Sequence, residues 1–321
     1  MTKSTEEVAG LSRQIIDEVE KAVIGKRPVL EDILAAFLCP GGHILLEDFP
    51  GLAKTLIANS FAVALGMSFK RIQFTPDLLP GDITGGYVFD RQENAFTLRR
   101  GPIFANIILA DEINRASPKT QSALLEAMQE GQVTLEGETQ RLPEPFMVIA
   151  TQNPIEYEGT FPLPEAQLDR FILKLAVGYP SAKDEVEILS QRRARKEEAF
   201  HLQAVTDTAG FQEMRAAVEE VYVEPDLEAY MVELVQRTRS YRSVAVGASP
   251  RGSLALLKLS RGRAAIQGRS YVLPDDIKHF AVPALVHRLI LEPELWTVRR
   301  AAENIISEVS SQTPVPVKKN G

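Results

Sequence analysis

Short apolar runs alternate with helical patterns along the first half of the chain. Between the first two runs, Lys54–Leu65 has apolar residues at helical spacing, and Pro118–Glu130 has the same pattern after a proline, which a first helical turn tolerates. The runs with the length and composition of buried strands are His43–Glu47, Phe69–Phe74, Asn106–Ala110, Phe146–Thr151 and Phe171–Val177. Strands that alternate with helices are typical of a parallel sheet covered by helices, so we predict an α/β domain.

Two stretches interrupt this alternation. Ile83–Leu98 has short apolar runs on both sides of a polar turn at Arg91–Asn94, and Gln132–Leu142 has the same arrangement around Glu136–Glu138. We therefore predict two inserted hairpins, at about residues 83–98 and 132–142. Hairpins that leave a globular body commonly touch another molecule, although surface hairpins without a partner fit the pattern too.

The pattern becomes helical after Gly178-Tyr179-Pro180. The predicted helices are Ala182–Glu198, Phe211–Glu219, Asp226–Ser240, Ser249–Gln267, Pro274–His287 and Glu292–Ser310. We predict a core domain over residues 1–180 that carries both hairpins, and a smaller all-helical domain over residues 181–313. The last segment, residues 314–321, has little to bury and is predicted to be disordered.

Composition narrows the function classes. The 321 residues are 45% apolar and 25% charged, as in an ordinary globular protein, and the net charge of -7 disfavours a nucleic-acid partner. The sequence contains neither a run of 18 apolar residues nor a secretory signal, so we expect a cytoplasmic protein without a membrane span. Its single cysteine, Cys39, follows an apolar stretch and is predicted to be buried, and its four histidines lack metal-ligand spacing.

The segment Leu45–Thr55 has the form of a phosphate-binding loop between a strand and a helix. In such a loop, Lys54 would neutralise a polyphosphate and the hydroxyl of Thr55 would ligate magnesium. However, Asp48 and Ala53 stand where the first and last glycines are expected. Asp48 puts a carboxylate near phosphate unless its side chain points away, and Ala53 is harmless if its backbone angles are helical. Alone, this segment fits an ordinary strand, turn and helix equally well.

Polar side chains also follow two further strands. Asp111 and Glu112 come directly after one apolar strand, where Asp111 could hold magnesium and Glu112 could polarise an attacking water. Asn153 follows the next predicted strand and could hold that water from the opposite side. Each alone would be an ordinary polar turn, but together with Lys54 and Thr55 they indicate a nucleotide site.

These residues, in this order, resemble the AAA+ ATPases and, among them, the MoxR family. The resemblance is carried by Val23-Ile24-Gly25-Lys26, Pro50-Gly51-Leu52-Ala53-Lys54-Thr55, Ala110-Asp111-Glu112-Ile113-Asn114-Arg115-Ala116, Ala150-Thr151-Gln152-Asn153-Pro154, Leu163-Pro164-Glu165-Ala166-Gln167-Leu168-Asp169-Arg170-Phe171 and Gly247-Ala248-Ser249-Pro250-Arg251. It extends from about residue 20 to residue 295. The resemblance implies an AAA+ P-loop αβα sandwich with a five-stranded parallel sheet, followed by a helical lid.

The resemblance also implies that the protein binds ATP and Mg²⁺. The residues implied to contact them are Gly25, Asp48, Pro50, Gly51, Leu52, Ala53, Lys54, Thr55 and Asp111, with Gly25 by the adenine. Thr55 and Asp111 would hold the metal, Glu112 would activate water, and Asn153 would sense the terminal phosphate.

Two arginines are implied to complete the catalytic machinery. Arg170 resembles an arginine finger, which reaches into a neighbouring subunit's site and stabilises charge on the transferred phosphoryl group. Arg251 resembles the second sensor, which couples lid position to nucleotide state, and Arg115 is a weaker candidate for the subunit interface. As isolated residues, all three would be read as surface arginines in solvent or in ion pairs.

The family implies an oligomeric ring, hexameric in our interpretation, that couples ATP hydrolysis to chaperone-like remodelling or maturation of client proteins. Partners with a von Willebrand factor A domain are also implied, and the hairpins would project towards the ring pore. A magnesium-chelatase-type motor subunit is a close alternative. A scaffold that binds ATP but hydrolyses little is another, which Asp48 encourages. A nucleic-acid motor is disfavoured by the acidic composition.

Overall fold

The computed structural model describes residues 3–49, 51–92, 94–153 and 160–316. At its centre lies a five-stranded sheet in the order β2-β5-β8-β1-β9. All neighbouring strands in it are parallel, which confirms the predicted α/β fold. The strands are β1 (Ile44–Glu47), β2 (Phe69–Gln73), β5 (Ile107–Asp111), β8 (Met147–Gln152) and β9 (Leu173–Leu175), and each overlaps a predicted run.

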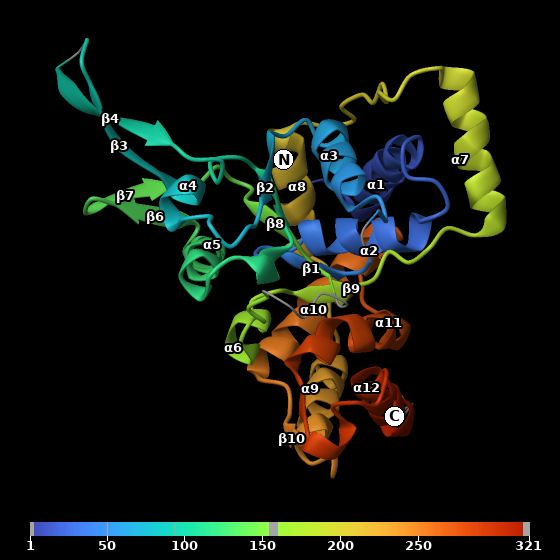
Figure 1. Cartoon of the computed structure of the whole chain (residues 1–321). Helices are drawn as coiled ribbons and strands as arrows, with labels where there is room; N and C mark the ends of the chain where they lie inside the picture. Colours follow the sequence, from blue (N-terminus) through green and yellow to red (C-terminus); the bar gives the residue numbers. More distant parts are fainter. Residues whose placement is uncertain (1–2, 50, 93, 154–159, 317–321) are drawn as a thin grey trace.

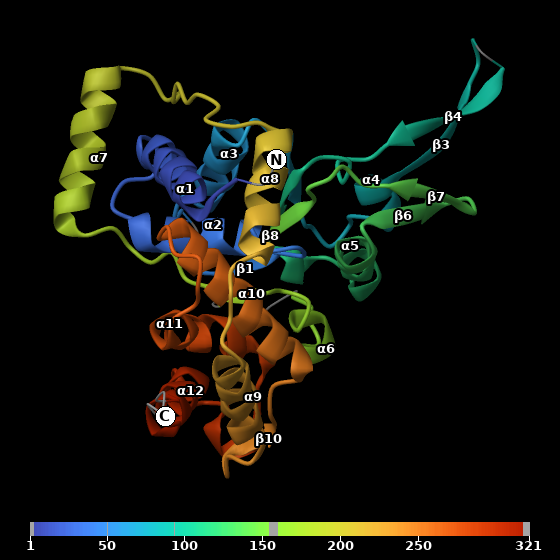
Figure 2. The same cartoon turned by 180° about the vertical axis from the view of Figure 1, so that it is seen from behind.

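Helical layers cover both faces of this sheet (Figures 1 and 2). Side chains such as Ile44 and Leu109 belong to a core that includes helices α1 (Thr5–Glu20), α2 (Arg27–Phe37) and α3 (Lys54–Ala64). Alternate side chains such as Leu45 and Ile108 pack with α5 (Pro118–Glu130) in a second cluster. A strand with apolar residues on both faces must be covered on both, which explains the continuous apolar runs in the sequence. Cys39 is buried, as predicted, and burial raises the pKa of its thiol to about 12.

Two antiparallel hairpins extend away from the body (Figures 1 and 2). The first pairs β3 (Gly85–Asp90) with β4 (Ala95–Arg100) after the short helix α4 (Pro80–Thr84), and the second pairs β6 (Gln132–Leu135) with β7 (Glu138–Arg141). The hydroxyl of Tyr87 donates a hydrogen bond of 2.5 Å to the carboxylate of Glu138, so the two hairpins contact each other.

Among the described residues, the second half of the chain is mainly helical and contains, besides β9, one short antiparallel strand pair. Its elements are α6 (Glu165–Leu168), α7 (Ala182–Arg195), α8 (Thr208–Glu219), α9 (Pro225–Arg239), β10 (Val244–Val246), α10 (Pro250–Ile266), α11 (Pro274–Leu285), the 3₁₀ turn η2 (Val286–Arg288), β11 (Ile290–Leu291), η3 (Pro293–Leu295) and α12 (Ala301–Gln312). The predicted helix Glu292–Ser310 is wrong in its first part, because Arg300 has a left-handed backbone and α12 begins only after it.

The lid helices share one continuous core with the first layer. Apolar residues of α8 to α12 belong to the same buried cluster as α1, α2 and α3, and α10 packs directly on α2. By contrast, α7 stands apart from the body in Figure 1, and none of its residues, all within the described part of the chain, is buried. The division into domains at about residue 180 stays a prediction.

The end of the chain was predicted to be disordered from residue 314. Val315 packs against the main core, and residues 317–321 lie outside the described residues. Within the described helices, none has the length and apolar character needed to cross a membrane.

Candidate nucleotide site

A cavity of 390 Å³ opens where β1, β5 and β8 reach their carboxyl ends. It is lined by Gly51, Leu52, Ala53, Lys54, Thr55, Leu56, Arg71, Gln73, Asp111, Glu112, Thr151 and Asn153. The structure therefore brings together the phosphate-loop residues, the carboxylate pair and the amide that the sequence singled out. Parallel strands carry their carboxyl ends to one edge, where ligands bind in open α/β sheets.

The phosphate loop has two residues with left-handed backbone. Gly51 has φ of 82°, and Ala53, the residue before α3, has φ of 55° and ψ of 16°. Ala53 therefore lacks the helical angles that would have made it harmless: the turn that aims α3 at the cavity needs the conformation that glycine adopts without strain. Pro50 lies outside the described residues.

The ammonium group of Lys54 is held inside this loop. Its Nζ donates to the backbone carbonyl oxygens of Asp48, at 2.8 Å, and Phe49, at 3.1 Å. Burial lowers the pKa of Lys54, and the carboxylates of Asp48, Asp111 and Glu112 oppose that shift. The lysine thus has acidic neighbours and lies where a polyphosphate would be neutralised.

The carboxylate of Asp48 does not line the cavity. It is buried and accepts hydrogen bonds from the backbone N–H of Gly178, at 2.6 Å, and of Phe49, at 3.1 Å. Its negative charge is therefore bound to the connection that leads into α7. This contact accounts for an aspartate where a phosphate loop usually has glycine.

The two carboxylates after β5 have different surroundings. Asp111 accepts from Thr151 Oγ1 at 2.7 Å and from Arg71, at 3.0 Å from Nε and 2.6 Å from Nη2. Glu112 has a left-handed φ of 57°, accepts from Gln73 Nε2 at 2.7 Å, and has an ion pair of 3.3 Å with Arg115. Strained residues of this kind concentrate at functional sites.

The lining includes three polar residues to which the sequence analysis gave no role, namely Arg71, Gln73 and Thr151, although Thr151 lies in one of the family-like stretches. Arg71 and Gln73 stand two apart on β2, so they face the same side of the strand at its carboxyl end. This two-residue spacing of polar side chains on a predicted strand is the feature of the sequence that could have identified them. The Thr151 hydroxyl connects the two acids, because it also accepts from the backbone N–H of Glu112 at 2.8 Å.

The donor set of the cavity suits a nucleotide with Mg²⁺. Thr55 offers a hydroxyl and Asp111 a carboxylate, and hard oxygen ligands are those that Mg²⁺ prefers. Lys54 and the N-terminus of α3 supply the positive end that phosphate groups need.

Gly25 lies outside this lining, beside the start of α7. A Cβ atom there would come within 2.6 Å of all three carboxyl atoms of Asp184, and Lys26 donates to the carbonyl oxygen of Tyr179 at 2.8 Å. Gly25 therefore permits a close approach between the N-terminal segment and the connection that Asp48 also contacts.

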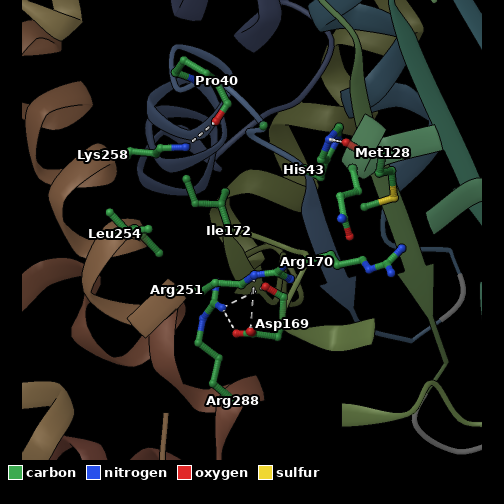
Figure 3. Close-up of a pocket in the computed structure, with 13 residues that line it drawn as sticks. Pro40, His43, Met128, Asp169, Arg170, Ile172, Arg251, Leu254, Lys258 and Arg288 are labelled. Carbon is green, nitrogen blue, oxygen red and sulfur yellow. Dashed lines mark hydrogen bonds and ion pairs between the residues drawn. The ribbon is translucent and has the colours of Figure 1, made fainter. Parts of the chain in front are cut away.

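Arg170 and Arg251 lie in a different cavity, of 290 Å³, between the sheet domain and the lid (Figure 3). Asp169, the residue before Arg170, also lines this cavity, and Arg251 Nε lies 3.9 Å from its carboxylate. Among the described residues, the linings of the two cavities have no member in common. The structure thus separates both arginines from the phosphate loop of their own chain.

Comparison with known proteins agrees with this architecture. The profile of the ATPase family associated with various cellular activities (AAA) matches residues 43–173, and the AAA lid domain profile matches residues 236–309. The chain is 47% identical to the uncharacterized protein YeaC of Bacillus subtilis, over 98% of both chains. It is 42% identical to the chaperone MoxR1 of Mycobacterium tuberculosis, over 97% of this chain and 83% of that protein.

A solved structure from Cytophaga hutchinsonii, assigned as an ATPase, superposes with a TM-score of 0.90 at 39% identity, over 98% of this chain and 97% of that one. Its agreement extends through the sheet domain and the helical lid together. The chain belongs to the MoxR family of AAA+ ATPases.

Proposed function

We propose that this protein hydrolyses ATP in the cavity at the carboxyl edge of its sheet. The observation that carries the proposal is that Lys54, Thr55, Asp111, Glu112 and Asn153, from three separate segments, line one cavity. Membership of an AAA+ ATPase family supports the same conclusion.

Each side chain has a role that follows from its chemistry. Lys54 neutralises the phosphates, and the loop N–H groups orient them. Thr55 and Asp111 would hold Mg²⁺, which supplies charge neutralisation on the phosphate oxygens when bound. Glu112 polarises the attacking water and Asn153 holds it from the other side.

We further propose that Arg170 and Arg251 complete the site of a neighbouring subunit in a ring, which we take to be hexameric. Their separation from the phosphate loop of their own chain supports this arrangement. A guanidinium at the terminal phosphate stabilises the charge that develops there, so a lone subunit would hydrolyse slowly.

The ring would couple hydrolysis to remodelling or maturation of client proteins through the two hairpins, alongside a partner with a von Willebrand factor A domain. A relative at 42% identity is named a chaperone, which supports this class of function. A motor subunit of the magnesium-chelatase type is the alternative to this function. The scaffold alternative loses its main support, because the Asp48 carboxylate is bound to Gly178 rather than directed at phosphate.

Steady-state ATP turnover against protein concentration tests the proposal. Turnover per subunit is expected to rise with concentration. Lys54→Ala is expected to abolish it, and Arg170→Ala is expected to reduce it to a low residual rate. Mixing the two variants should restore part of it, since an Arg170→Ala subunit keeps its own phosphate loop and borrows a finger from a Lys54→Ala neighbour. Wild-type turnover in the Arg170→Ala variant would refute the shared site, and an inactive wild type would refute the ATPase assignment.

A further inference from the structure

We propose that Arg288, on the lid, is a positioning residue that holds the Arg170 loop and makes it move with the lid of its own subunit. The inference rests on the proposed role of Arg170 as the finger for a neighbouring site. It adds a residue that the motif comparison did not mark.

The guanidinium of Arg288 binds the backbone on both sides of Arg170. Its Nη1 donates to the carbonyl oxygen of Asp169 at 2.9 Å, and its Nη2 donates to the carbonyl oxygen of Phe171 at 2.7 Å. Nη1 also pairs with the Asp169 carboxylate. A planar, five-donor group is suited to such a clamp, because it fixes several acceptors in one geometry.

Arg288 is itself firmly anchored in the lid. Its side chain is only 2% exposed, and its Nε donates to the carbonyl oxygen of Ala284 on α11 at 2.7 Å. Neighbouring His287 approaches the carbonyl oxygen of Phe171 at 3.0 Å through Nε2. Burial lowers the pKa of the Arg288 guanidinium, and the charge of Asp169 offsets part of that shift.

The opposite side of Asp169 faces the start of α10. Ser249 Oγ donates to the Asp169 carboxylate at 3.0 Å. Two residues later, Arg251 Nε lies 3.9 Å from the same carboxylate (Figure 3). Asp169 is therefore bound to two lid elements, α10 and η2. Arg170 lines the cavity between the sheet domain and the lid, with its backbone held on both sides.

Rigid attachment explains why an arginine and not a lysine occupies position 288. A lysine ammonium keeps the charge but is a point donor and cannot span the two carbonyl oxygens in a fixed plane. Because a displacement of about 1 Å can lower a rate by about a hundredfold, a loosened loop would misplace the finger without removing it.

The test compares Arg288→Lys, Arg170→Ala and the double variant, with Arg237→Lys as a control. Arg237 is a surface arginine on α9 that pairs with Glu233 at 2.6 Å. We expect Arg288→Lys to lower kcat by about tenfold to a hundredfold, with the KM for ATP little changed and with a Tm that is lower but still well above the assay temperature. Arg237→Lys should match wild type in all three.

Two further measurements distinguish a positioning role of Arg288 from a role in folding alone. Adding Arg288→Lys to Arg170→Ala should cause no further loss of kcat, because one residue acts through the other. Arg288→Lys mixed with Lys54→Ala should regain turnover, as the Arg170→Ala mixture does.

Unchanged kcat in Arg288→Lys, or losses that add in the double variant, would overturn the inference while leaving the ATPase proposal intact. Wild-type turnover in Arg170→Ala would overturn both, since no finger would then need positioning. A loss of turnover in Arg288→Lys that follows a fall in Tm and is not rescued by mixing would also contradict it.

Discussion

Left-handed backbone at single residues sets the shape of the candidate site. Ala53 and Glu112 both have positive φ, at 55° and 57°, and each immediately precedes a helical turn that borders the cavity. A side chain in this region costs about 1–2 kcal/mol relative to ordinary helical angles. The strain at Glu112 holds a carboxylate that belongs to the proposed chemistry, whereas the methyl group of Ala53 has no role in that chemistry.

Replacing Ala53 with glycine is expected to stabilise the fold. The Ala53→Gly substitution removes the steric cost of φ at 55°, so the free energy of unfolding should rise by up to about 1 kcal/mol, as a small upward shift of Tm. Ala53→Val is the matched control and should lower Tm, since branched side chains tolerate this conformation worst. A lower Tm for the glycine variant would contradict the argument.

His43 makes stability depend on pH. Its ring is buried between α5 and β8: Val148 N–H donates to Nδ1 at 3.1 Å, so Nε2 carries the proton towards the Met128 carbonyl oxygen at 3.0 Å. Burial lowers the pKa to about 4 from 6.5. The unfolded chain therefore binds a proton first, and stability that is complete above pH 6.5 is lost as pH falls towards 4.

This contribution amounts to roughly 3 kcal/mol over that window. We expect the fall in Tm between pH 7 and pH 5 to be smaller in His43→Gln, whose amide is neutral throughout, than in wild type. His201→Gln, at an exposed histidine, should keep the wild-type dependence. Equal pH dependence in all three proteins would exclude His43 as the group responsible.

Local motifs explain which site residues could be found from sequence. Lys54 begins the helix after β1, Asp111 ends β5 and Asn153 follows β8, so their convergence at one edge of the parallel sheet follows from chain order. The bond between Asp48 and Gly178 joins residues 130 apart, and no local pattern encodes it. Arg71 and Gln73 resemble any polar pair on a strand until β5 is placed beside them.

At the scale of elements, α7 owes its helical state to local interactions. Ser181 and Asp184 form a capping box, acidic residues occupy the first turn, and arginines occupy the last turn. Such features stabilise both helix ends. Because its 14 residues contribute nothing to a buried core within the described chain, α7 lacks the packing on which most protein helices depend.

The amides of α7 should therefore exchange much faster than those of α10, which packs on α1, α2, α8, α9 and α11. Hydrogen exchange followed by mass spectrometry, on protein dilute enough to be monomeric, measures this directly. Equally slow exchange in the two helices would show that α7 has a stabilising contact in the monomer that the structure lacks.

Sequence periodicity located most elements but not their ends. The strands were found because parallel sheets bury both faces of each strand. The start of α12 was missed, since Arg300 adopts a left-handed backbone that only glycine or asparagine would have signalled. The way in which the lid packs back on α1 and α2 depends on contacts between distant residues.

At the scale of the whole molecule, one close helix contact joins the lid to the sheet domain. Gly262 of α10 lies against α2, where an added Cβ would come within 2.8 Å of the carbonyl oxygen of Ala35. Backbone on both sides leaves nothing flexible to move aside. The relative position of the lid and the sheet domain therefore depends on residue 262 being a glycine, which has no side chain.

Gly262→Ala is expected to lower the free energy of unfolding by about 1–3 kcal/mol, because the helices must separate. Gly10→Ala in α1 is the matched control: space is open around it, so the same change should stabilise by up to about 1 kcal/mol. Thermal unfolding of both variants measures the difference. A neutral Gly262→Ala would mean that α10 shifts on α2 without cost.

The hydrogen bond between Tyr87 and Glu138 has a mechanical consequence for the whole molecule. A single two-stranded ribbon bends easily, but the two hairpins leave the body separately, after α4 and after α5. They are joined between Tyr87, near the root of the first hairpin, and Glu138, at the tip of the second. Two hairpins joined in this way support each other against bending. A sideways pull on the tip of β3–β4 is therefore resisted partly as tension or compression along β6–β7, and force reaches the sheet domain through two anchors.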